Sequence, residues 1–178
     1  MQPGVGKNYF ELFGLPARFD VDLPGLNNRY RSLQQQFHPD RFASGSEQER
    51  RMAMELTASI NEGLRVLRNP LARARYLLEL AGISVNDETD TAMNPAFLME
   101  QMEWREQLDA VRSGPADDAG PVLQSLSKDV NNAFNRRVDQ LRTELNNDDL
   151  SAARTHVREL QFLDKLKMQI EEIEESLF

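Results

Sequence analysis

The segment QFHPDRF, residues 36–42, places a histidine and a carboxylate two positions apart, with an aromatic residue on each side. His38 could act as a general base, with Asp40 orienting its ring. However, Pro39 restricts the backbone between them, and no serine or cysteine adjoins the segment to serve as a nucleophile. For the tripeptide on its own, a plain surface turn between two helices is the simpler interpretation.

A metal site at His38 would need further ligands at suitable spacing. The only other histidine, His156, lies far along the chain, and neither histidine belongs to an HxxxH or ExxH pattern. A small metal-dependent hydrolase that uses His38, Asp40 and His156 is the alternative from a different functional class. Our main interpretation is a protein without catalytic residues, metal or cofactor of its own.

Composition narrows the class of protein. The chain has 178 residues and no cysteine, which excludes disulfides, thiolate metal sites and cysteine nucleophiles. No segment has the ~18 consecutive apolar residues of a membrane-spanning helix. The first ten residues, MQPGVGKNYF, lack the apolar run of a secretory signal. We expect a soluble, cytoplasmic protein with no membrane partner.

Charge divides the chain into two parts. Residues 1–81 carry 11 basic and 9 acidic side chains, a net charge of +2, whereas residues 82–178 carry 10 and 20, a net charge of −10. Such asymmetry predicts two domains, 1–81 and 82–178, with different partners. The acidic half argues against nucleic acid, because phosphate binding needs a basic surface.

Helical spacing predicts an all-α fold, and strand signals are almost absent. In the first half, a short helix from Asn8 precedes two longer helices, which begin at the N-caps Asp22 and Ser46. Pro39 ends the first long helix. The short connection predicts an antiparallel hairpin with HPD at its tip. The apolar faces of the two helices are Leu26, Tyr30, Leu33 and Phe37, and Ala53, Leu56, Ile60, Leu64 and Leu67.

The second half predicts a three-helix bundle. A polar linker, GISVNDETDTAMNP, leads to helices over 95–112, 121–147 and 149–177, with a loop at 112–121. The 121–147 helix carries the apolar residues Leu123, Val130, Phe134, Leu141 and Leu145. The last helix carries the heptad-like stripe Leu163, Leu166, Ile170, Ile173 and Leu177, which is typical of bundle packing.

The 95–112 helix has more apolar surface than one face can hold. Phe97, Trp104, Leu108 and Val111 fall on one stripe, which suits the bundle core. A second side carries Leu98, Met99 and Met102 beside Glu103 and Glu106, and Phe162 likewise lies off the main stripe of its helix. This second surface either packs within the protein or binds a partner, and flexible methionines suit a partner.

The context of HPD carries a family resemblance. NYFELFGL upstream, arginines 29, 31 and 41 around the tip, and INEGLRVL downstream together resemble the J-domain of DnaJ-type co-chaperones. With RNPLARARYLLEL, NPAFLMEQMEWREQL and ELQFLDKLK, nearly the whole chain is similar to the HscB family, the J-type co-chaperones of iron–sulfur cluster assembly. Some family members carry an N-terminal cysteine-pair metal site, which this chain lacks.

The resemblance implies two partners, an HscA-type ATPase chaperone and an IscU-type scaffold protein. It implies an N-terminal J-domain and a C-terminal scaffold-binding domain, and no enzyme activity of the chain itself. A J-protein that serves a general DnaK-type chaperone is the nearest alternative. The implied chaperone-binding residues are His38, Pro39, Asp40, Arg29, Arg31 and Arg41, and the implied scaffold-binding residues are Leu98, Met99, Met102, Glu103, Glu106 and Phe162.

Overall fold

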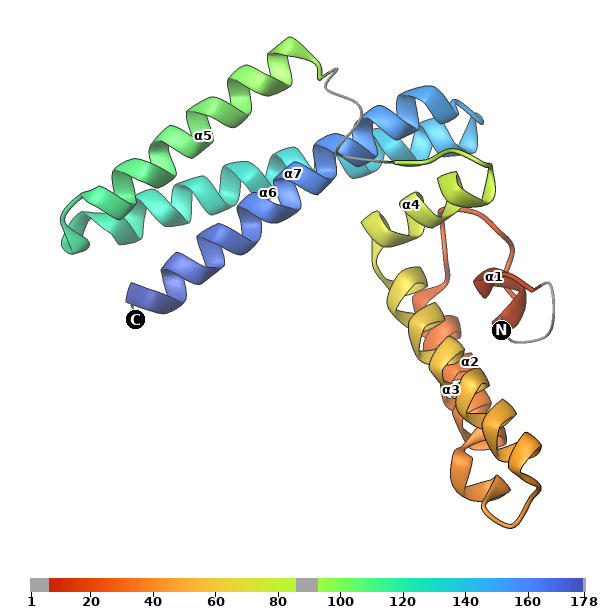
Figure 1. The fold of residues 1–178 in the computed structure, drawn as a ribbon. Helices are drawn as coiled ribbons and strands as arrows, with labels where there is room; N and C mark the ends of the chain where they lie inside the picture. The colour runs from red at the N-terminus through yellow and green to blue at the C-terminus, as the bar shows by residue number, and fades with distance from the viewer. Residues whose placement is uncertain (1–6, 86–92, 178) are drawn as a thin grey trace. The chain divides into compact units, whose positions relative to one another are not determined.

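The computed structural model describes residues 7–85 and 93–177, and every regular element in these ranges is a helix (Figure 1). The all-α fold class is therefore confirmed. The chain divides into two compact units, residues 1–81 and 82–178. The first holds α1 (Tyr9–Leu12), α2 (Leu23–Phe37), the 3-10 helix η1 (Pro39–Phe42), α3 (Glu47–Arg68) and α4 (Pro70–Leu80); the second holds α5 (Pro95–Ser113), α6 (Ala116–Asn146) and α7 (Leu150–Leu177).

An antiparallel hairpin of α2 and α3 forms the body of the first unit (Figure 1). Its core is a cluster of fully buried side chains from three helices, Phe10, Phe13, Leu26, Ile60 and Leu67. The remaining residues of the predicted face of α2, namely Tyr30, Leu33 and Phe37, pack against this cluster. Burial of these faces stabilises the hairpin by roughly 1.5–3 kcal/mol per large apolar side chain.

The predicted residues cap the N-termini of α1, α2 and α3 with their side chains. Asn8 and Ser46 form capping boxes, in which each side chain accepts a hydrogen bond from a backbone N–H in the first turn. Glu11 and Glu49 accept the return bonds from the N–H groups of the capping residues. The side chain of Asp22 caps α2. These bonds satisfy N–H groups that have no partner inside the helix.

Gly63 of α3 lies where α1 packs on the hairpin. A β-carbon at this position would come within 2.9 Å of the Phe13 ring and 3.0 Å of the Tyr9 ring. On its other side, α1 is held by α4, because the backbone N–H of Tyr9 donates to Tyr76 Oη at 3.0 Å. Burial raises the pKa of the Tyr76 phenol above its ordinary value. The absence of a side chain at Gly63 therefore allows α1 to pack closely on α3.

We expect Gly63→Ala to destabilise the first unit by about 1–3 kcal/mol, because the added methyl group displaces two aromatic rings of a packed core. Gly120→Ala is the matched control. Gly120 is also helical, but a β-carbon there meets nothing within 4 Å beyond its chain neighbours. Alanine favours the helix and the following Pro121 opposes a side chain in the helical conformation, so the substitution should change the free energy of unfolding by less than about 1 kcal/mol. Denaturant unfolding of both variants measures the difference, and equal stability would contradict the close contact.

The second unit is a bundle of α5, α6 and α7 (Figure 1). Its buried side chains include most of the residues predicted from periodicity. They are Phe97, Trp104 and Leu108 of α5, Leu123, Val130 and Leu141 of α6, and Leu163, Leu166 and Ile170 of α7. The predicted three-helix bundle is therefore confirmed, with its core along the predicted stripes.

The start of α6 differs from the sequence prediction. We predicted a loop through residues 112–121, whereas α6 begins at Ala116 and contains Pro121. A proline inside a helix removes one hydrogen bond and costs about 3 kcal/mol. Ala119 and Leu123, on either side of Pro121, are both buried in the bundle. Their burial offsets the local cost of the proline. Local sequence signals do not report such tertiary burial.

Candidate functional site

His38 and Asp40 stand at the exposed end of the α2–α3 hairpin. Their side chains are 56% and 90% exposed, with 3.5 Å between His38 Nδ1 and Asp40 Oδ2. The backbone N–H of Asp40 donates to His38 Nδ1 at 3.2 Å. Because Nδ1 accepts this bond, a neutral His38 carries its ring proton on Nε2. The pair therefore offers an imidazole N–H and a carboxylate side by side to a partner.

The tip is a defined turn rather than an open loop. Pro39 begins the single turn of η1, and the backbone N–H of Arg41 donates to the His38 carbonyl at 2.9 Å. Two of the last carbonyls of α2 have side-chain donors, since Arg41 Nη1 donates to Gln35 O at 2.9 Å, and the Thr57 hydroxyl lies 3.1 Å from Phe37 O and shares its one proton with Ala53 O at 2.8 Å. These bonds use carbonyls that the helix end would leave without a partner. They hold the turn in one geometry.

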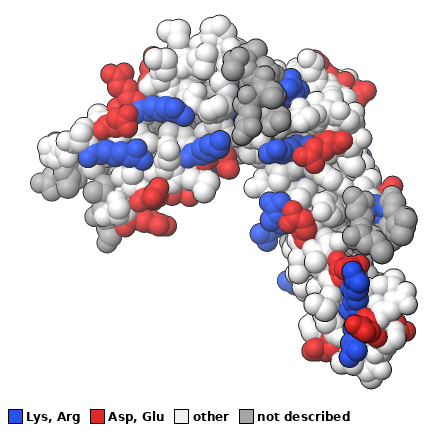
Figure 2. Space-filling view, viewed as in Figure 1, with Lys and Arg blue, Asp and Glu red and all other residues white. Residues whose placement is uncertain are grey.

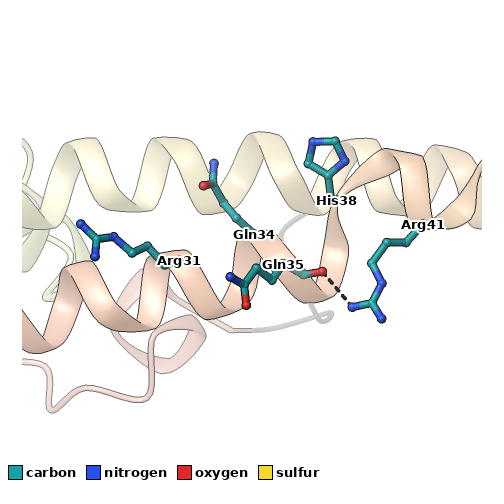
Figure 3. Close-up of a pocket in the computed structure, with 5 residues that line it drawn as sticks. All are labelled: Arg31, Gln34, Gln35, His38 and Arg41. Carbon is teal, nitrogen blue, oxygen red and sulfur yellow. Dashed lines mark hydrogen bonds between the residues drawn. The ribbon is translucent and has the colours of Figure 1, made fainter.

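A depression beside the tip is lined by Arg31, Gln34, Gln35, His38 and Arg41 (Figure 3). The two arginines lie at opposite ends of this row in Figure 3. Two cations around a concave surface are suited to carboxylates of an acidic partner, since guanidinium groups bind them bidentately. Gln34 and Gln35 were not predicted as site residues, because an isolated glutamine on a helix belongs to no motif.

A chain of hydrogen bonds through Tyr30 connects the Gln34 side chain to Asn61 of α3. Gln34 Nε2 donates to Tyr30 Oη at 2.6 Å, and the Tyr30 hydroxyl donates to Asn61 Oδ1 at 2.9 Å. Asn61 belongs to the INEGLRVL segment that the sequence singled out. The segment therefore supports the depression through hydrogen bonds as well as packing α1.

Arg29 lies apart from the other two predicted arginines. Its Nη1 donates to the carbonyl of Phe13 at 2.5 Å and also to that of Gly14. Gly14 has φ +62°, a left-handed conformation that glycine adopts without strain. Arg29 thus holds the α1–α2 connection, and the structure does not group it with Arg31 and Arg41 around the depression. The family resemblance implies all three as chaperone-binding residues.

The second apolar side of α5 faces away from the core. Leu98, Met99 and Met102 are 40%, 67% and 69% exposed, and Glu103 and Glu106 beside them are exposed as well. We call these five residues the methionine face. Trp104, which we placed in the core, is buried. The methionine face therefore presents apolar surface with an acidic border.

Phe162 of α7 is half-buried, and Lys165 Nζ lies 5.7 Å from the centre of its ring. Glu100 of α5 and Glu159 of α7 bind the same arginine of α6, Arg137. α5 and α7 both run antiparallel to α6, so they pass Arg137 in the same direction (Figure 1). Phe162 lies three residues after Glu159 in α7, and Glu103 lies three residues after Glu100 in α5. Phe162 and the methionine face are therefore at a similar height along the bundle.

The two histidines belong to different units. His156 Nδ1 lies 2.7 Å from Glu144 Oε1, which joins α7 to the end of α6. Within the described residues, no group of three or more histidine, aspartate or glutamate side chains could hold a metal ion. His38, Asp40 and His156 are not brought together within either unit. The structure gives no support to the hydrolase alternative.

Acidic and basic side chains are interspersed on the surface. On the face drawn in Figure 2, Lys and Arg alternate with Asp and Glu over both units. The coloured residues of this face form no continuous basic tract of the kind that follows a nucleic-acid backbone. Among the helices that the structure describes, none is long and apolar enough to cross a membrane.

Comparison with known proteins identifies the family. A family model described as the HSCB C-terminal oligomerisation domain matches residues 93–171. The chain is 42% identical over 171 residues to a co-chaperone protein HscB homolog of Vibrio vulnificus (strain YJ016), which covers 96% of this chain and 99% of that protein. The chain belongs to the HscB co-chaperone family.

Solved structures of HscB proteins share the fold. The chaperone HscB of Vibrio cholerae matches with a TM-score of 0.86 at 41% identity, covering 97% of this chain and all of that one. The human co-chaperone HscB matches with a TM-score of 0.89 at 26% identity, covering 98% of this chain and 85% of that one. These HscB relatives are named as chaperones or co-chaperones and not as enzymes.

Proposed function

We propose that this HscB-family protein is an adaptor in iron–sulfur cluster assembly. Its first unit docks on an HscA-type ATPase chaperone and stimulates ATP hydrolysis by that chaperone. Its second unit binds an IscU-type scaffold protein and delivers it. The chain itself catalyses no reaction and needs no cofactor, and we place it in the cytoplasm. The observation that carries this function is an exposed histidine–carboxylate pair on a hydrogen-bonded turn beside a basic depression.

The chaperone-docking surface combines shape and charge. His38, Pro39 and Asp40 form its centre, and Arg31 and Arg41 form its basic border. Opposite charges speed the encounter of two proteins, and paired guanidinium–carboxylate bonds orient them. Arg29 contributes indirectly in this proposal, since it holds the connection that precedes α2. An acidic groove on the ATPase is the matching surface.

The scaffold-binding surface is the methionine face together with Phe162. A contiguous group of exposed apolar side chains with a polar border is typical of protein–protein interaction sites. Glu103 and Glu106 supply a polar rim, as borders of interfaces commonly do. A scaffold with an apolar patch and basic neighbours fits this surface.

A J-protein for a general DnaK-type chaperone is the second candidate. Its action on the chaperone would need only the hairpin and its tip. The methionine face is exposed apolar surface on the second unit, which supports a client that binds this unit and not only the hairpin. We therefore favour the scaffold-specific function.

The division of labour is tested with Arg31→Glu/Arg41→Glu. We expect this variant to bind the ATPase chaperone about tenfold or more weakly, because reversed charges repel an acidic groove. Affinity for the scaffold should stay unchanged, because the other unit carries that site. Calorimetric titrations with each purified partner measure both. Wild-type chaperone binding should also weaken with added salt, since exposed charges are screened over ~8 Å near physiological ionic strength.

The matched control is Arg18→Glu/Arg68→Glu, which changes net charge equally. Arg18 precedes α2 and Arg68 ends α3, so both lie at the end of the hairpin opposite the tip (Figure 1). This control should keep chaperone affinity near the wild-type value. Equal loss in both double variants, or loss of both partners in the first, would contradict two separate docking surfaces.

A further inference from the structure

One arginine connects all three helices of the second unit. Arg137 of α6 places Nε 2.8 Å from Glu159 Oε2 of α7 and Nη2 2.8 Å from Glu100 Oε2 of α5. Its guanidinium carbon also lies 4.8 Å from the centre of the Phe97 ring. Both contacts to α5 fall in the helical turns that carry Leu98, Met99 and Met102.

The centre of the connection is largely removed from water. The side chains of Arg137 and Glu159 are 12% and 6% exposed and Phe97 is buried, whereas Glu100 at the α5 end is 33% exposed. A buried ion pair adds little net stability, because the charges lose their hydration. The best-attested use of such a pair is to select one packing arrangement among several that apolar contacts would allow. A role in specificity therefore suits Arg137 better than a role in stability.

The first turns of α5 carry apolar side chains on two sides, so a second packing of these turns is conceivable. Phe97 faces the core while Leu98 beside it is exposed, and a helix turns by about 100° per residue. Apolar burial has no direction of its own, so a local rotation of the first turns of α5, N-terminal to the buried Trp104, could bury Leu98 and Met102 in place of Phe97. Rotation would carry Glu100 away from Arg137 and leave a buried guanidinium without this partner. The ion pair and the ring contact therefore favour the observed orientation.

We propose that Arg137, with Glu100 and Glu159, is a positioning device that keeps the methionine face turned outward. Arg137 does not contact the scaffold itself; it acts through the orientation of α5. This inference rests on the proposed scaffold binding only for its functional consequence. The orientation of α5 can be measured in the isolated protein.

The test uses the full chain with Arg137→Met/Glu100→Gln/Glu159→Gln, which removes the three charges together and leaves no buried charge orphaned. Methionine methyl groups labelled with carbon-13 report their accessibility through broadening by a soluble paramagnetic probe. We expect the Met99 and Met102 methyl signals to be protected or doubled in this variant, and scaffold affinity to fall about tenfold or more. The thermal midpoint should stay close to the wild-type value.

The matched control is Arg142→Met/Asp139→Asn, which removes an exposed ion pair of 2.8 Å from the same helix. It should change neither the methyl signals nor the affinity. If the triple variant fails to fold, Glu100→Ala alone decides, because it removes the ion pair between α5 and Arg137 and leaves Arg137 paired with Glu159. Wild-type methyl accessibility in the folded test variant would overturn the positioning role.

The two proposals can fail separately. If the wild-type protein does not bind the scaffold, the proposed function is wrong, yet the methyl signals still decide whether Arg137 orients α5. If methyl accessibility changes while scaffold affinity stays within about twofold of wild type, α5 is oriented by Arg137 but the methionine face is not the scaffold site. That result would overturn the functional part of the inference.

Discussion

His38→Gln should reduce stimulation of the ATPase chaperone to near its basal rate while the first unit stays folded. His38 is 56% exposed and packs in no core cluster, so its replacement should change unfolding free energy by no more than about 0.5 kcal/mol. The imidazole uses Nδ1 to accept the Asp40 N–H and leaves Nε2 for a partner. The amide of glutamine, on a longer and more flexible chain, does not preserve both positions.

The other histidine supplies the control for this experiment. His156 pairs with Glu144 and lies partly buried in the second unit, so His156→Gln should lower stability without affecting stimulation. Steady-state ATP turnover of the purified chaperone, with each variant beside its thermal melt, separates the two effects. Full stimulation of the chaperone's ATPase by a folded His38→Gln protein would contradict the proposed J-domain function.

Alanine at Met99 or Met102 should weaken scaffold binding by about 1–3 kcal/mol, the usual range for interface anchors. That corresponds to roughly a five- to hundred-fold loss of affinity. Folding stability should barely change, because both side chains are mostly exposed and their removal creates no core cavity. Chaperone stimulation in the absence of scaffold should also survive, since the tip of the hairpin is untouched.

Two further variants make this result specific. Met168 of α7 is 63% exposed and lies outside the methionine face, so Met168→Ala should leave scaffold affinity unchanged. Trp104 is buried in the bundle, so Trp104→Ala should cost about 3–5 kcal/mol of stability. Calorimetric titration with scaffold and a thermal melt of each protein give both quantities. If Met99→Ala unfolds the bundle as Trp104→Ala does, the methionine face is part of the core.

The two sites place different demands on the fold. The tip must present His38 and Asp40 in one geometry, and the hydrogen bonds of Arg41 and Thr57 to the end of α2 provide it. The methionine face must stay outward on a helix with apolar residues on two sides, and Arg137 favours that orientation. In each case the supporting residues come from a neighbouring element.

Most of the helical fold could be predicted from the sequence because its signals are local. The caps at Asn8, Asp22 and Ser46 and the stop at Pro39 act within a few residues of themselves. Apolar periodicity likewise identified the faces that the structure buries. The start of α6 could not be predicted this way, because burial of Ala119 and Leu123 in the bundle outweighs the local signal of Pro121.

The sequence by itself determined the order of the helices, the position of HPD between two of them, and the excess of apolar surface on the 95–112 helix. Only the tertiary structure decided which contacts the polar and small side chains of these helices make. It placed Arg29 on the carbonyls of the α1–α2 connection, Gly63 against two aromatic rings, and Arg137 between two helices distant in sequence. These roles depend on contacts between residues far apart in the chain, whose distances are set by how the helices pack and leave no trace in local spacing.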